Sequence, residues 1–74
     1  MSNFEITLEI MNTIINSEKE LSSKMIATIM NKNGFQVDKK TINQFVYKMK
    51  DLGLIIQNAS QSPPTYSSKC IKIS

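Results

Sequence analysis

Apolar residues recur with helical spacing between Asp38 and Gly53, and this stretch has the clearest pattern in the chain. Steps of about 100° around a helical wheel define an apolar face that consists of Thr41, Ile42, Phe45, Val46, Met49 and Leu52. The opposite face is polar and consists of Lys39, Lys40, Asn43, Gln44, Tyr47, Lys48, Lys50 and Asp51. Asp38 can cap the first free backbone N–H groups, and Gly53 can adopt the left-handed conformation that ends a helix. The pattern therefore predicts an amphipathic helix with a lysine-rich exposed face.

Two further helices are predicted before this one. Residues 3–16 carry two adjoining apolar stripes, the first made of Phe4, Leu8, Met11 and Ile15 and the second of Ile6, Ile10 and Ile14. Another helix should begin at a serine cap, Ser22 or Ser23, and end at Asn33-Gly34. Because a tight glycine-containing turn joins it to the helix after Asp38, the pair predicts a helix-turn-helix.

Short strands are expected around this pair of helices. Residues 19–21, 54–58 and 65–70 have the composition of strands, and residues 59–64 form the loop between the last two. The predicted fold class is α+β: a winged helix-turn-helix with three helices and a small two- or three-stranded antiparallel sheet. One domain should span residues 1–74, with residues 71–74 expected to fray.

Charge and composition narrow the range of functions. Residues 1–37 carry four Glu and three Lys, whereas residues 38–74 carry six Lys and two Asp, so the net charge of +3 arises in the second half. All nine basic residues are lysine, which permits phosphate contacts but not the bidentate reading of guanine by arginine. The chain has no His, so its single cysteine, Cys70, has no histidine to act as a base partner. We therefore expect no enzymatic activity, no cofactor, no metal and no small-molecule substrate.

The expected location is the cytoplasm or the nucleus. No apolar run approaches the roughly 20 residues of a membrane span, and the N-terminus lacks the basic and apolar blocks of a secretory signal. A lone cysteine also favours a reducing compartment.

Two features allow both a functional and a structural interpretation. Tyr47 lies among Lys40 and Asn43 on the polar face, where its ring could meet a base or sugar beside phosphates. Equally, the ring could lie flat over a neighbouring element with its hydroxyl in water. Pro63 and Pro64 could protect an exposed sheet edge, or they could form a rigid apolar ledge against a sugar–phosphate backbone.

These residues belong to a pattern that resembles the Z-alpha domain. The pattern is Lys39-Lys40-x-Ile42-Asn43-x-x-x-Tyr47-x-Met49, followed by a glycine, a strand and Ser62-Pro63-Pro64-x-Tyr66. Z-alpha domains are winged helices that bind left-handed Z-form DNA and RNA, and some belong to host-defence antagonists of large DNA viruses. The resemblance implies that Tyr47 packs on a syn guanine and that Asn43 bonds phosphate directly and through water. It also implies phosphate contacts by Lys39 and Lys40.

The resemblance assigns roles in the wing too. Pro63 and Pro64 match prolines that lean on the sugar–phosphate backbone. Tyr66 stands where the family usually has Trp, which supports the helical tyrosine and reaches phosphate through water. Ser62 lies near a position often occupied by Thr. Gln44 replaces an arginine that contacts phosphate in some members, and the loss of such a contact should weaken binding.

The predicted function is therefore binding and stabilisation of Z-form double-stranded DNA or RNA. Alternating CG duplexes should be favoured, and the protein should be a monomer that can place two copies on one duplex. The resemblance also suggests a viral antagonist of host Z-nucleic-acid sensing, which acts in the infected cell. Two alternatives stay open: a winged-helix regulator that binds right-handed DNA, and a winged-helix module that binds another protein.

Overall fold

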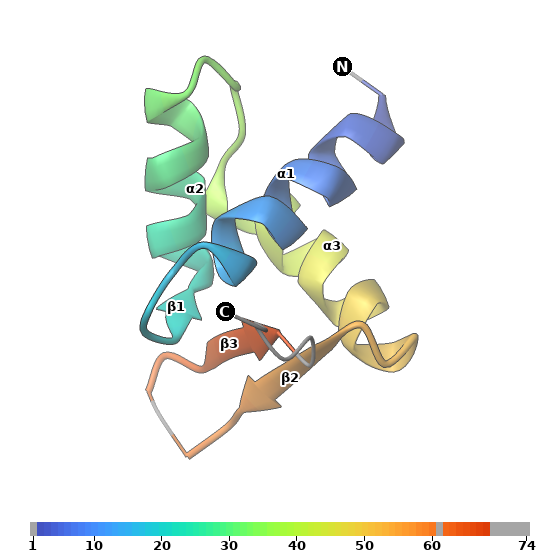
Figure 1. Ribbon diagram of the computed structural model, residues 1–74, viewed down its shortest axis with the longest axis vertical. Coiled ribbons are helices and arrows are strands. Elements are labelled where there is room, and N and C mark those ends of the chain that lie inside the picture. The colour runs from blue at the N-terminus through green and yellow to red at the C-terminus, as the bar shows by residue number, and fades with distance from the viewer. Residues whose placement is uncertain (1, 61, 69–74) are drawn as a thin grey trace.

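The computed structural model describes residues 2–60 and 62–68 of the chain. Its elements are, in order, α1 (Asn3–Ile15), β1 (Leu21–Ser22), α2 (Ser23–Lys32), α3 (Lys39–Asp51), β2 (Ile55–Asn58) and β3 (Thr65–Ser68). The helices lie together on one side of a small sheet, and β2 and β3 project below α3 as a wing (Figure 1). The predicted α+β winged-helix fold class is confirmed.

Each helix begins at a side chain that accepts a hydrogen bond from the first turn. The N–H of Glu5 donates to the hydroxyl of Ser2 at 3.1 Å, and Ser22 caps α2 in the same way. For α3, the N–H of Thr41 donates to the carboxylate of Asp38 at 2.8 Å. These bonds satisfy backbone donors that have no partner inside a helix, so the starts of α2 and α3 lie where the sequence predicts them.

Glycine ends both helices of the helix-turn-helix. Gly34 and Gly53 have φ angles of 95° and 78°, a region in which other residues are strained. After α3, the N–H of Gly53 donates to the carbonyl of Lys50, and the N–H of Leu54 donates to that of Met49, both at 2.9 Å. This paired arrangement reverses the chain at the end of a helix. It leads the chain directly from α3 into β2.

The wing is joined to the helices through the sheet. The strand order is β1-β3-β2, and both pairings are antiparallel. Tyr66 of β3 therefore lies opposite Leu21 of β1 on one side and opposite Gln57 of β2 on the other. Because β1 runs directly into α2, the central strand fixes the wing to the helix-turn-helix.

All six elements contribute to one core. Its buried apolar residues are Ile6, Ile10, Ile14, Leu21, Ile26, Ala27, Met30, Ile42, Val46, Met49, Ile55 and Tyr66. Phe35 and Val37, between α2 and α3, are partly buried against it, as expected for residues that fill the gap between the two helices. The polar face of α3 is thus left outside.

The structure differs from the sequence pattern at several edges of the fold. The helix α1 buries the stripe that contains Ile6 and Ile10, while Phe4 and Leu8 of the other stripe are 69% and 52% exposed, because one thin core can cover only one side of this helix. Leu52 is exposed because it caps the end of α3 instead of packing on the core. The first strand begins at residue 21, not 19. Cys70, the end of the last predicted strand and the predicted tail lie outside the described residues.

Candidate nucleic-acid interface

A groove of about 130 Å³ lies where α3 meets the wing. Three parts of the fold line it: Ser23 and Lys24 of α2, Lys39, Asn43 and Tyr47 of α3, and Pro63, Pro64 and Tyr66 of the wing. The structure therefore brings three of the predicted helix residues together with three of the predicted wing residues. The volume of the groove is below the roughly 300–1,000 Å³ that is typical of small-molecule pockets. The groove is suited to one protruding group of a larger partner.

Tyr47 forms part of the groove as a surface residue. The residue is 50% exposed, and its ring is not part of the buried core. The Nζ atom of Lys50 lies over the ring, 5.0 Å from its centroid. A cation at this distance is attracted to the π-system, so Lys50 helps to hold the ring while leaving it in contact with solvent.

Tyr66 has the opposite environment. It is only 2% exposed, and its hydroxyl accepts a hydrogen bond from Nε2 of Gln57 at 3.3 Å. The Oε1 atom of the same glutamine accepts a hydrogen bond from Nζ of Lys50, also at 3.3 Å. A polar chain thus runs from Tyr66 through Gln57 and Lys50 to the ring of Tyr47. This chain links the buried ring of Tyr66 to the exposed ring of Tyr47.

Asn43 is oriented by a residue of α2. The hydroxyl of Ser23 donates a hydrogen bond to Oδ1 of Asn43, and Ser23 itself is buried. The accepting side of the Asn43 amide is therefore occupied within the protein. Its NH₂ side, which donates hydrogen bonds, is the side suited to a phosphate oxygen.

The other predicted residues lie around the groove. Lys39 lines it, whereas Lys40 and Gln44 are exposed on α3 and are not among its lining residues. Gln44 instead borders a separate hollow against the start of α1. Ser62 is exposed and joined to Pro63 by a cis peptide bond, next to the groove but not lining it.

A carboxylate directly before β1 also holds the wing in place. Glu20 accepts hydrogen bonds from the hydroxyl of Thr65 at 2.6 Å and from Nδ2 of Asn58 at 3.0 Å. Both hydrogen bonds lower the pKa of Glu20, because they stabilise its charged form. The bond from Thr65 has the larger effect. The segment before β1 is thereby tied to both strands of the wing.

Five contributors to this region were missed by the sequence analysis: Ser23, Lys24, Lys50, Gln57 and Glu20. Lys50 is three residues after Tyr47, so helical spacing could have indicated the pair. Ser23, Gln57 and Glu20 act through contacts between distant parts of the chain, and Lys24 lines the groove from a second helix. No local pattern reveals either arrangement.

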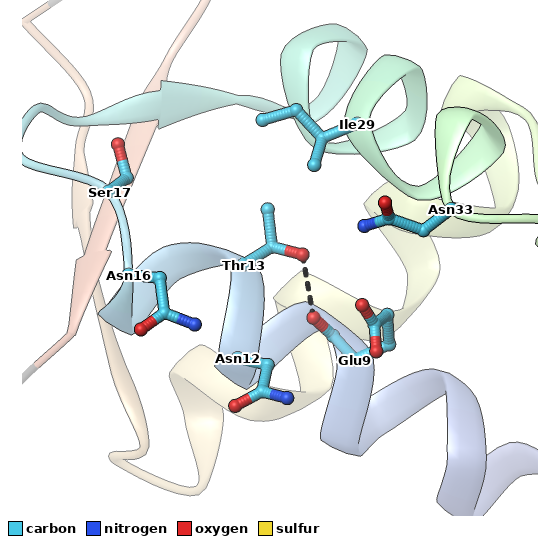
Figure 2. A pocket seen from close by; sticks show the side chains of 7 residues that line it. All are labelled: Glu9, Asn12, Thr13, Asn16, Ser17, Ile29 and Asn33. Atoms are coloured by element: carbon cyan, nitrogen blue, oxygen red, sulfur yellow. Dashed lines mark hydrogen bonds between the residues drawn. The ribbon is translucent and has the colours of Figure 1, made fainter.

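A second hollow, between α1 and α2, has a different character. It has a volume of about 300 Å³ and is lined by Glu9, Asn12, Thr13, Asn16, Ser17, Ile29 and Asn33. Figure 2 shows amide side chains around it and the hydroxyl of Thr13 bonded to the carbonyl of Glu9, at 2.7 Å. The charged side chain among these lining residues is a carboxylate, which would repel a polyanion. The groove beside α3 is therefore the better candidate for nucleic acid.

The protein is thus a winged-helix domain whose groove is lined by basic and aromatic side chains. Comparisons with protein-family models, with curated proteins and with solved structures found no match. The resemblance to Z-alpha domains stays a prediction from the motif. Among the helices in the described part of the chain, none has the length and apolar character to cross a membrane.

Proposed function

We propose that this domain binds left-handed Z-form double-stranded DNA or RNA and stabilises that conformation. The observation that carries the proposal is the shared groove, in which Asn43 and Tyr47 of α3 meet Pro63 and Pro64 of the wing. These are the residue types of the Z-alpha motif at the positions that the resemblance assigns. An exposed tyrosine beside a lysine and an oriented amide also fits a backbone-binding surface without the motif.

The chemistry of the groove suits a left-handed duplex. A Z-form duplex has a zigzag backbone, no usable major groove and syn purines with an exposed edge, so it can be recognised without hydrogen bonds to bases. Lys39 and Asn43 supply donors for phosphates along one rigid helix. The half-exposed ring of Tyr47 supplies an apolar surface for a protruding base. Recognition of this kind depends on the shape of the backbone rather than on sequence.

The wing prolines add a second line of contact. Pro63 is exposed and Pro64 is partly buried beside the groove. Their rings have little conformational entropy to lose when they meet a sugar–phosphate backbone. Contact on two lines, one on α3 and one on the wing, restricts the backbone paths that the protein can accept.

Conversion of a right-handed duplex would follow from differential affinity alone. A protein that binds the Z state more tightly than the B state shifts the equilibrium between them. Moving a duplex from 1% to 99% Z-form requires a preference of about 10⁴-fold. No chemical step and no cofactor is needed.

Circular dichroism of alternating CG duplexes tests the proposal. We expect the spectrum of CG DNA, and of CG RNA in a parallel titration, to invert toward the left-handed form as the domain is added. A right-handed spectrum that persists at saturation, with binding confirmed by anisotropy, would contradict the proposal and favour a regulator of B-form DNA. Absence of salt-sensitive binding to any duplex would favour a protein-binding module.

The resemblance also suggests a biological setting for this activity. A small domain that holds Z-RNA would act by sequestration, and we propose that it serves as a viral antagonist of host Z-RNA sensing. An excess of the domain should then displace a host sensor domain from a Z-form duplex. Retention of the sensor under saturating conditions would contradict this role but not the binding activity.

A further inference from the structure

We propose that Lys24, in the first turn of α2, is a further phosphate-binding residue of this interface. The inference rests on the proposed function, since it extends the same groove. It adds a third line of contact, from α2, to the lines on α3 and the wing. The motif that suggested the site contains no residue of α2.

The position of Lys24 carries the proposal. Its side chain is exposed and lines the same groove as Lys39, Asn43 and Tyr47. The neighbouring Ser23 is buried, at 4% exposure, and donates its hydrogen bond to Asn43. The first turn of α2 is therefore tied directly to the residue of α3 best suited to a phosphate. A side chain held on a rigid helix in this way is placed for binding more reproducibly than one on a loop.

The charges around the groove point to an anion. Both charged side chains among its described lining residues are lysines, Lys24 from α2 and Lys39 from α3. Two lysines that line one small hollow make the local potential positive, and a positive potential attracts an anionic group. A phosphate of a duplex has the charge and the acceptor oxygens for this place.

The surroundings of Lys24 also favour an extended side chain. Lys24 borders a neighbouring, mainly apolar hollow that includes Leu21, Met25 and Ile29. A lysine can rest its aliphatic stem on such a surface while its ammonium group stays in water. The exposed side chain can then meet a phosphate that lies in the groove.

The salt dependence of binding tests the proposal with a pair of charge-matched variants. Lys24→Ala removes a cation at the groove, and Lys32→Ala removes one from the last turn of the same helix. Affinity for an alternating CG DNA duplex is measured by anisotropy at several salt concentrations. Each phosphate contact by a lysine adds about 0.9 to the magnitude of the slope of log affinity against log salt.

We expect Lys24→Ala to reduce that magnitude by about 0.9 and to weaken binding by roughly three- to tenfold at 0.1 M salt. Lys32→Ala should leave the slope unchanged, since it changes net charge without removing a contact. Equal slopes for the two variants would overturn the proposal. Lys24→Gln, which keeps most of the stem, and a thermal melt of each variant separate loss of contact from loss of fold.

The wild-type titration separates this proposal from the proposed function. If the wild-type domain leaves CG duplexes right-handed, the Z-form proposal fails. The pair of variants then tests phosphate contact by Lys24 on whichever duplex the domain binds, and binding to none overturns both proposals. If the wild type converts the duplex and Lys24→Ala behaves like Lys32→Ala, only the inference about Lys24 fails.

Discussion

The helix α3 and the wing carry the two halves of the proposed interface, and they are held in place by different kinds of contact. Contacts encoded within one short stretch define α3: a cap from Asp38, an apolar face buried at Ile42 and Val46, and a reversal at Gly53. The wing is held by side chains from elsewhere. Glu20 bonds Asn58 and Thr65, which are 38 and 45 residues away in the sequence.

Because of this difference, ligand binding and folding should depend on different residues. The groove residues of α3 project from a helix whose opposite face makes the core, so they can change without loss of packing. The wing contributes Tyr66 to the core itself. We therefore expect changes on α3 to affect ligand binding first, and changes in the wing to affect stability first.

The two tyrosines provide the largest contrast. Tyr66→Ala removes a ring that is 2% exposed, and we expect a loss of about 3–5 kcal/mol in the free energy of unfolding. Tyr47→Ala removes a half-exposed ring and should cost less than about 1 kcal/mol. Urea denaturation measures both values. Equal losses would show that Tyr47 belongs to the core and that the contrast is wrong.

Conversion of the duplex to the Z-form should be most sensitive to the changes on α3 that cost little stability. Asn43→Ala and Tyr47→Ala should each abolish conversion of a CG duplex, since one removes a phosphate donor and the other a stacking surface worth about 1–3 kcal/mol. Asn12→Ala, in the hollow between α1 and α2, is the matched control for Asn43→Ala and should convert normally. Circular dichroism measures conversion and helix content together. Conversion by Tyr47→Ala at the wild-type protein concentration would exclude a role for the ring.

A smaller effect is expected where the two halves meet, at Lys50. Lys50→Ala should weaken duplex binding by about 0.5–1 kcal/mol more than Lys48→Ala, because Lys50 contacts both Tyr47 and Gln57, whereas Lys48 is exposed on the same helix. The two variants lose the same charge from the same helix. Lys50→Arg, which keeps a cation, should recover part of the difference. Equal affinities for Lys50→Ala and Lys48→Ala would show that the polar chain does not position Tyr47.

The smallest expected effect is the pH dependence of the wing. Hydrogen bonds lower the folded-state pKa of Glu20, so its contribution to stability is present above the ordinary glutamate pKa of about 4.3 and is lost as pH falls through the lowered pKa. Glu20→Gln should be less stable than the wild type at pH 7. The gap should narrow below about pH 4, as measured by urea midpoints at each pH. A gap independent of pH would contradict an ionic role for Glu20.

The same contrast explains what the sequence could predict. The helix after Asp38, its polar face and its glycine end depend on neighbouring residues, so periodicity and capping were sufficient. The motif singled out Pro63 and Pro64, and the structure places both beside the groove, while their role in binding stays a prediction. The packing of Phe4 depended on where other elements lie, and one helix alone cannot show which of its two apolar stripes is covered.

For a related reason, local sequence patterns could not reveal the residues that orient the side chains of the site. Ser23 reaches Asn43 only because α2 packs on α3, and Gln57 reaches Tyr66 only through strand pairing. Side chains that orient other side chains leave no periodic signal. They become visible once the tertiary structure is known, and here they link α2, α3 and the wing around one groove.

The most direct test of the account compares the affinity of the domain for two CG duplexes that differ in handedness. One is held left-handed by bulky groups at guanine C8, which favour the syn conformation, and the other is held right-handed by linkage to a rigid B-form stem. Both are measured at the same salt concentration. We expect the left-handed duplex to bind more tightly by orders of magnitude, and that preference should disappear in Tyr47→Ala. Equal affinity for the two duplexes, or preference for the right-handed one, would contradict the account.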